Sequence, residues 1–176
     1  MKVGDLVFLD EFGAATNMAR THGRGPKGER VVGKVPHGHW KTLSTVAALG
    51  AGGILTAVSY DGAMNGECFA GFIEQFLAPA LRPGQVVVMD NLPAHKSAEV
   101  SRLIGATGAR VLYLPPYSPD FNPIEMAISK TKALLRKEAA RTVQALIDAV
   151  GRSLSAITPD EAEHYIRHCG YGATNN

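Results

Sequence analysis

Three acidic residues stand where chain geometry could bring their side chains together. Asp10 follows the apolar run LVFL, Asp90 follows the apolar run VVVM, and Glu125 ends a proline-rich stretch. Such runs are typical of buried strands, and ligand sites in open α/β sheets form beyond the carboxyl ends of strands. We therefore expect Asp10 and Asp90 each to end a strand. If these two strands are neighbours, the aspartates approach each other, and a helix could carry Glu125 to the same place.

Carboxylates placed side by side raise one another's pKa, and burial adds to the cost of keeping them charged. Divalent cations remove this penalty, and oxygen ligands without a Cys or His cluster favour Mg²⁺ or Mn²⁺ over Zn²⁺. Two such ions about 3.5–4 Å apart clamp the attacking and leaving oxygens of a phosphodiester displacement. Asp10, Asp90 and Glu125 are therefore the candidate catalytic and metal-binding residues, with Mg²⁺ as the expected cofactor and Mn²⁺ as its substitute.

Each acid also has a structural interpretation. An aspartate at a strand end is common, and Asp90 followed by Asn91 could simply begin a turn. Glu125 lies three residues after Asn122, a good N-cap, and Pro123 suits the first helical position, which is the spacing of a capping box. A capping residue can still bind a metal ion, so the residues alone leave both interpretations open.

The elements that would position these acids begin with a hairpin and then alternate. The turn GAGG at residues 50–53 separates two strand-like runs, and apolar residues between 65 and 77 recur at helical spacing. The predicted strands are 6–10, 42–49, 54–60, 86–89 and 110–114, and the predicted helices are 65–77, 94–104, 123–137, 143–154 and 159–168. This order predicts an α/β fold, a mixed five-stranded sheet flanked by helices, and it resembles the ribonuclease H-like fold.

Positive charge is concentrated in two segments. The formal net charge is only +2, yet eleven of the eighteen Lys and Arg residues lie within residues 20–41 and 130–141. Concentrated positive charge suits a polyanion, although the same residues could form solvated faces. Residues 13–39 lack hydrophobic periodicity and exceed the usual loop length, which predicts an irregular excursion that is functional or mobile.

Length, composition and cysteine count indicate a globular protein of one domain. A length of 176 residues suits one domain, and 45% hydrophobic and 19% charged residues are typical of globular proteins. No apolar run approaches the roughly 20 residues that span a bilayer, and the first residues do not resemble a signal peptide. Two cysteines are too few for a disulfide framework. We therefore expect no membrane partner and a cytoplasmic location.

Three motifs together resemble the catalytic domain of DDE transposases. They are FLDE around Asp10, VVVMDNLPAHKS around Asp90 and LPPYSPDFNPIE ending at Glu125. The likeness is to the mariner superfamily and, within it, to the bacterial insertion-sequence branch called the IS-six-thirty group. Thirty-four residues separate Asp90 from Glu125, which is the spacing of that superfamily. The resemblance extends from about Leu6 to the C-terminal helices.

This resemblance implies a role for each acid: Asp10 would bridge two metal ions, Asp90 would hold one of them and Glu125 the other. It implies a cut-and-paste transposase that hydrolyses phosphodiester bonds at inverted-repeat transposon ends and joins the freed 3′ ends to a TA target. The implied partners are double-stranded DNA and, in the DNA complex, a second copy that forms a homodimer. A bacterial enzyme of this kind would associate with the nucleoid when bound to DNA.

Seven further residues are candidate DNA contacts. The resemblance places His95 and Lys96 at the start of a helix, where they would contact phosphates. Lys132 and Arg136 lie seven and eleven residues after Glu125 and share its helical face, although an amphipathic surface helix explains the same pattern. The remaining candidates belong to the basic loop and are Arg24, Lys27 and Arg30.

Two residues near these candidates are expected to have other roles. Glu11 follows Asp10 and, on an extended strand, points to the opposite face of the sheet. Trp40 is the single tryptophan and is expected in the core. On α-helical spacing, the stripe that should face the core beside Glu125 consists of Ile124, Ile128, Thr131 and Leu135.

Transposases of this branch carry a helix-turn-helix region ahead of the catalytic domain, whereas this sequence begins directly on the first predicted strand. We therefore interpret residues 1–176 as one catalytic domain without that region: a shortened form, the downstream frame of a split gene, or a remnant. The alternatives are a ribonuclease H-like nuclease or resolvase, and a catalytically silent, domesticated DNA-binding module. The proline-rich third motif argues against the nucleases, and the three intact acids argue against decay.

Overall fold

A mixed five-stranded sheet forms the centre of the structure, a computed structural model that describes residues 2–116 and 118–172. Tyr117 of the proline-rich motif therefore lies outside the described residues. The strands are β1 (Leu6–Ala15), β2 (Thr42–Gly50), β3 (Gly53–Asp61), β4 (Val86–Met89) and β5 (Arg110–Tyr113). They lie in the order β3-β2-β1-β4-β5, with β1, β2 and β3 antiparallel and with β4 parallel to both β1 and β5. The predicted mixed sheet is confirmed, and the condition that its first and fourth strands are neighbours is met.

The helices are close to their predicted positions, with differences at their ends. They are α1 (Gly66–Phe72), α2 (Ala98–Ala106), α3 (Ile124–Glu138), α4 (Val143–Ser155) and α5 (Pro159–His168). Helix α1 continues through a π-helical turn (Ile73–Leu77) into a 3₁₀ turn (Ala78–Ala80), and further 3₁₀ turns are Val3–Asp5, Pro93–Lys96 and Pro119–Phe121. Ser97 caps α2 by accepting from the Val100 N–H, so that helix starts later than predicted. None of the helices in residues 2–116 and 118–172 is long and apolar enough to cross a bilayer.

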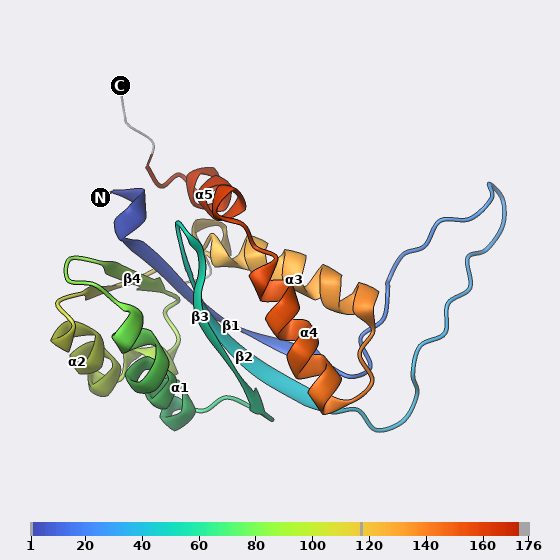
Figure 1. Cartoon of the computed structure of the whole chain (residues 1–176), viewed down its shortest axis with the longest axis horizontal. Helices are drawn as coiled ribbons and strands as arrows, with labels where there is room; N and C mark the ends of the chain where they lie inside the picture. The colour runs from blue at the N-terminus through green and yellow to red at the C-terminus, as the bar shows by residue number, and fades with distance from the viewer. Residues whose placement is uncertain (1, 117, 173–176) are drawn as a thin grey trace.

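The sheet separates two hydrophobic cores. Figure 1 shows α3, α4 and α5 over one face of the sheet and α1 and α2 over the other. Alternate residues of β1 enter the two cores: Phe8 and Phe12 pack with α3, α4 and α5, whereas Val7 and Leu9 pack with α1 and α2. The stripe predicted for α3 is buried in the first of these cores. By the same alternation Asp10 faces α3 and Glu11 faces α1, as predicted for Glu11.

Strand β1 is longer than predicted, so the expectation that Asp10 ends it is wrong. Beyond Asp10 the strand remains paired with β2, from Asp10 opposite Ala47 to Ala15 opposite Thr42. Its parallel pairing with β4, in contrast, stops at Phe8 opposite Val88. At Asp10, β1 is therefore still paired with β2 but no longer with β4. The edge of β1 that faced β4 is open beside Asp10.

The segment between β1 and β2 leaves the body of the molecule as a long arm, residues 16–41 (Figure 1). Residues 20–41 are all exposed, and the predicted irregular excursion is confirmed. Two contacts fix its root: the Thr16 N–H donates to the Lys41 carbonyl at 3.0 Å, and Arg141 Nη1 donates to the Thr16 and Met18 carbonyls, each at 2.9 Å. Trp40 lies on this arm with 58% of its surface exposed, so the expectation that it belongs to the core is wrong.

Helix α3, which carries Glu125, ends at a left-handed residue. Ala139 has φ 55° and ψ 47°, and its N–H donates to the Leu135 carbonyl at 2.9 Å. It is the one non-glycine residue with positive φ in the described part of the chain. A side chain in this conformation is strained, whereas glycine adopts it freely.

We predict that Ala139→Gly raises the free energy of unfolding by about 1 kcal/mol, because it removes this strain. Chemical denaturation measures the change. Ala133→Gly, at an exposed position inside α3, is the matched control and should lower stability by about 1 kcal/mol. Equal destabilisation by both substitutions would contradict the prediction.

Candidate active site

The three candidate acids face one cavity. Asp10, Asp90 and Glu125 line a cavity of about 430 Å³ together with Asn91 and Asn122. The rest of its wall is largely apolar and comes mostly from the proline-rich connector, with Pro115, Pro116 and Pro119. The fold thus brings together residues that are far apart in the sequence, as predicted.

The β1–β4 register explains the approach of the two aspartates. Phe8 is paired with Val88, so continuing two residues along both parallel chains sets Asp10 beside Asp90. Asp90 is the first residue after β4, as predicted, and 37% of its side chain is exposed. Asp10 is half-buried on the face covered by α3.

Asn122 joins the proline-rich connector to Asp10. Its Nδ2 donates to Asp10 Oδ2 at 3.0 Å, across 112 positions of sequence, while its buried Oδ1 has no partner among the described residues. The predicted capping box is therefore wrong: the side chain of Asn122 binds Asp10, and only its backbone carbonyl accepts from the Glu125 N–H, at 3.1 Å. Helix α3 consequently begins at Ile124, and Glu125 is exposed in its first turn.

The hydroxyl of Tyr171 fixes the turn that precedes Asn122. It donates to the Phe121 carbonyl at 2.8 Å, and the Tyr171 ring packs edge-on against Phe8 with centroids 4.9 Å apart. The segment after α5 thereby holds the connector against β1. Because prolines also restrict the connector in the unfolded chain, less entropy is lost in presenting Glu125 at the cavity.

Asp10 is the electrostatic centre of the site. Its pKa is raised to about 7, first by burial and then by the charges of Glu125 and Asp90. The Glu11 N–H, which donates to Asp10 Oδ1 at 2.7 Å, and the nearby His95 act in the opposite direction. In such surroundings the ionised form of a carboxyl group is unfavourable unless a cation binds beside it.

Asp90 is held by the turn that follows it. Its Oδ1 accepts from the Leu92 N–H at 3.2 Å and lies 2.5 Å from His95 Nδ1. The other nitrogen, His95 Nε2, lies 3.2 Å from Glu11 Oε1. Since both imidazole nitrogens face carboxylate oxygens, both are placed to donate. Burial lowers the pKa of His95, but the hydrogen bond to Glu11 and the charge of Asp90 outweigh it, so the pKa is raised overall.

The predicted DNA contact by His95 is wrong for this arrangement. Only 2% of its side chain is exposed, and the ring stacks on Phe69 with centroids 4.2 Å apart. The reason is local: Pro93–Lys96 forms a 3₁₀ turn, with the His95 N–H bonded to the Leu92 carbonyl, which directs His95 inward. A phosphate cannot reach a side chain that is enclosed in this way.

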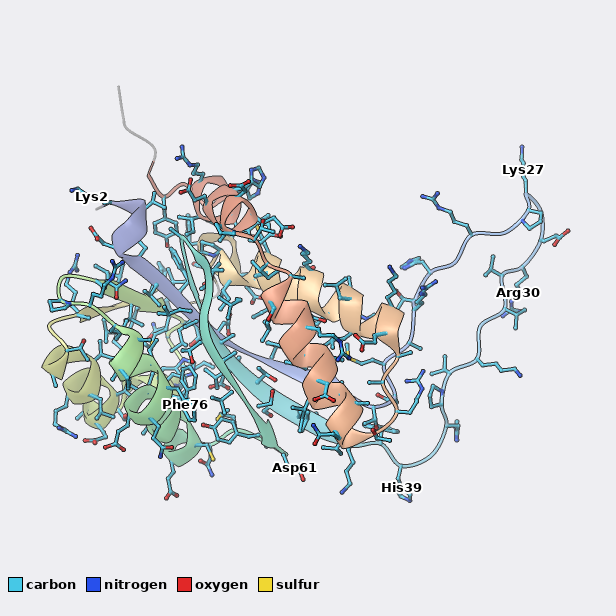
Figure 2. The ribbon with its side chains drawn as sticks, viewed as in Figure 1. Lys2, Lys27, Arg30, His39, Asp61 and Phe76 are labelled. Atoms are coloured by element: carbon cyan, nitrogen blue, oxygen red, sulfur yellow. The ribbon has the colours of Figure 1, made fainter. Side chains whose placement is uncertain are left out.

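The other predicted DNA contacts remain accessible. Lys96 is exposed, and Lys132 and Arg136 are partly exposed along α3 beyond Glu125. Figure 2 shows Lys27 and Arg30 far out on the arm, and Arg24 is also exposed there. The structure therefore does not bring the arm residues to the carboxylates.

Sequence reasoning missed two site residues. Glu11 was treated as secondary because it points to the opposite face from Asp10, and Asn122 was interpreted only as a helix cap. Their partners lie 84 and 112 positions away, so no local pattern marks these contacts. The adjacency of two acids in the pair Asp10-Glu11 was the one signal that could have drawn attention to Glu11.

The donor set suits a hard divalent cation, although the cage is not closed. In residues 2–116 and 118–172, no three Asp, Glu, His or Cys side chains lie close enough to hold one ion as they stand. The converging groups are nevertheless all oxygen donors, and buried Oδ1 atoms of Asn91 and Asn122 lack partners beside them. Burial and the neighbouring carboxylates raise the pKa of Asp10, and a cation bound there would offset both effects. A cation would therefore fit Asp10 and Asp90, with Glu125 joining from the first turn of α3.

The sequence matches a known family over most of its length. The family described as DDE superfamily endonuclease matches residues 5–147, which include all three acids. This chain belongs to the DDE superfamily of endonucleases. No curated protein sequence matches it.

The fold of this DDE endonuclease is that of the Mos1 transposase catalytic domain, a ribonuclease H-like fold. A Mos1 transposase paired-end complex with the left transposon end matches with a TM-score of 0.79 at 16% identity, over 95% of this chain and 52% of that chain. The isolated catalytic domain of Mos1 mariner transposase matches with a TM-score of 0.63 at 14% identity, over 95% of this chain and 76% of that one. The chain thus spans about half the length of the transposase in the paired-end complex.

We predict that Asp10→Asn stabilises this DDE endonuclease in metal-free buffer at pH 8. Because the pKa of Asp10 is about 7 in the folded chain against 3.8 in the unfolded chain, the unfolded state releases its proton first. The free energy of unfolding of the wild type therefore falls as the pH rises from about 4 to about 7, and asparagine removes this loss, at most about 4 kcal/mol.

Urea denaturation with EDTA at pH 5 and pH 8 tests this expectation. Asp61→Asn, at an exposed position at the end of β3, is the matched control and should show no such gain. A variant Asp10→Asn whose advantage is the same at both pH values would contradict the assignment of a raised pKa to Asp10.

Proposed function

We propose that this chain is the catalytic domain of a cut-and-paste DNA transposase that uses two Mg²⁺ ions, or Mn²⁺ in their place. Asp10, Asp90 and Glu125 would hold the ions, with Asp10 between the two. The observation that carries the proposal is the shared cavity of these acids, which lie within the region matched by the endonuclease family. An active site for a phosphodiester needs such carboxylates together with cations for the phosphates around them.

The chain's own residues would orient the ligands before DNA arrives. Asp10 is held from two sides, by the Glu11 N–H and by Asn122 Nδ2, so its carboxylate plane is set relative to β1. Among residues 2–116 and 118–172, the bonds to the Asp90 side chain go to Oδ1, which leaves its second oxygen for the cavity. Bound divalent cations would supply the positive charge that activates the attacking oxygen and stabilises the leaving oxygen.

The position of Glu125 suits the third ligand. It stands in the first turn of α3, on a helix whose start is fixed by Asn122 and by the prolines of the connector. Its side chain is exposed at the cavity and can turn toward the two aspartates. The apolar proline wall beside it would limit the access of bulk water to the reacting phosphate.

The DNA substrate is proposed from charge and from the structural neighbours. Lys132 and Arg136 extend from Glu125 along α3, Lys96 lies near Asp90, and the arm adds Arg24, Lys27 and Arg30. Mos1 transposase has been determined as paired-end complexes with Mg and with Mn and as a strand transfer complex. For this chain we accordingly propose double-stranded transposon ends, a TA target and a homodimer in the DNA complex.

We also propose the branch of the transposase superfamily to which the chain belongs. The motifs FLDE, MDNLPAH and PYSPDFNPIE support the bacterial IS-six-thirty group of the mariner superfamily. Such an enzyme would work in the bacterial cytoplasm on nucleoid DNA. Since the chain spans about half of the transposase in the paired-end complex, recognition of transposon ends is proposed for the complete enzyme, and catalysis for residues 1–176.

We predict that Asp90→Ala weakens Mn²⁺ binding and abolishes cation-dependent nicking of supercoiled plasmid, each by more than about 100-fold, because a direct ligand is lost. Isothermal titration calorimetry measures the first effect and gel electrophoresis the second. Glu74→Ala, at an exposed site on the π-helical turn after α1, is the control. Equal Mn²⁺ binding by wild type and Asp90→Ala would refute the metal site.

We predict that the arm contributes directly to DNA affinity. Replacing Arg24, Lys27 and Arg30 together by alanine should reduce the slope of log K against log salt by about 2–3, because each lost phosphate contact removes about 0.9. Fluorescence anisotropy with a duplex of random sequence at several salt concentrations measures the slope.

The matched control for the arm replaces three exposed cations elsewhere, Lys2, Arg82 and Arg102. Lys2 lies at the opposite end of the molecule from Lys27 (Figure 2). This control variant should keep the slope of the wild type. If both triple variants shift the slope equally, the arm has no special part in DNA binding.

A further inference from the structure

Glu11 contacts the groups that hold both aspartates. Its backbone N–H donates to Asp10 Oδ1 at 2.7 Å. Its side-chain Oε1 lies 3.2 Å from His95 Nε2, and His95 Nδ1 lies 2.5 Å from Asp90 Oδ1. One residue of β1 is thereby connected to Asp10 through its backbone and to Asp90 through an imidazole.

The early end of β4 makes this connection possible. Asp10 and Glu11 are consecutive residues of an extended strand, so their side chains leave opposite faces of the sheet. Because β4 stops at Met89, the edge of β1 is open beside Glu11, and the turn after Asp90 fills the space with His95. The two carboxylates approached by His95 therefore come from two different strands.

The imidazole is fixed on its remaining sides. Its ring stacks on Phe69 of α1, with centroids 4.2 Å apart and planes 25° apart. The Tyr113 hydroxyl donates to the His95 carbonyl at 3.0 Å, and 2% of the side chain is exposed. The enclosed ring therefore has one orientation, with Nε2 toward Glu11 and Nδ1 toward Asp90 Oδ1.

We propose that Glu11 and His95 are positioning residues that set the orientation of Asp90 relative to Asp10 for cation binding. Neither residue is among those that line the cavity, and Glu11 would act on Asp90 through His95. This inference rests on the proposed metal site. Hydrogen-bond partners of metal-binding groups typically change metal affinity by 10–100-fold when they are replaced.

Two substitutions of His95 separate its two contacts. In His95→Asn the side-chain nitrogen can take the place of Nδ1 and keep the bond to Asp90. In His95→Gln the nitrogen can take the place of Nε2 and keep only the bond to Glu11. We expect Mn²⁺ affinity, measured by calorimetry, to stay within about 3-fold of wild type in His95→Asn and to fall about 10–100-fold in His95→Gln.

Glu11→Ala tests whether Glu11 acts on Asp90 through His95. In the wild-type background it should weaken Mn²⁺ binding about 3- to 10-fold, since His95 loses one anchor. In the His95→Asn background it should change nothing, because the route from Glu11 to Asp90 no longer exists. An equal loss in both backgrounds would overturn the inference, because Glu11 would then act directly on the cation.

The controls keep failure of this inference distinct from failure of the metal site. If Asp90→Ala leaves Mn²⁺ binding unchanged, the proposed function fails. If Asp90→Ala abolishes binding while His95→Gln binds as the wild type does, only the positioning role is overturned. Thermal melts of each metal-free variant exclude unfolding as the cause, and should His95→Gln not fold, unchanged affinity in Glu11→Ala would overturn the inference by itself.

Discussion

Backbone hydrogen bonds between β1 and β4 hold Asp10 beside Asp90, and their repulsion has to be offset elsewhere. The pairing stops at Phe8 and Val88, so the two carboxylates stand just beyond the last shared rung of the ladder. Burial and the nearby acids keep the pKa of Asp10 near 7. Much of the surrounding structure follows from this constraint: donors surround both aspartates, and the helix with the third acid is attached to the first.

These supporting contacts come from three segments that are far apart in the sequence. Asn122 reaches Asp10 from the connector, His95 reaches Asp90 from the turn after β4, and Tyr171 holds the connector from beyond α5. Fixed donors around a charged site are characteristic of centres whose geometry must be set before the substrate binds. The site is thus assembled by tertiary contacts and belongs to no single segment.

Local patterns were sufficient to predict the sheet and the buried stripe of α3, whereas the pairing of the first and fourth strands was only a condition. Alternation along strands and helical spacing depend on residues close in the sequence, and the structure has both patterns where they were predicted. The extension of β1 past Asp10 was missed because its continuation is stabilised by pairing with β2, residues 42–47, beyond the arm. The inward turn of His95 and the bond from Asn122 to Asp10 also depend on distant partners. Trp40 was misplaced because a large aromatic residue usually indicates a core, whereas here it lies on the arm.

The continuity of β1 fixes the distance between Asp10 and the start of the arm. Asp10 and Thr16, where the arm begins, are six positions apart along one uninterrupted strand and its end. At about 3.3 Å per residue this separation is about 20 Å. B-DNA rises about 3.4 Å per base pair, so the same distance corresponds to about six base pairs. Strand β1 therefore sets a nearly constant separation between the carboxylates and the root of the arm, and the DNA substrate proposed above would meet both at this spacing.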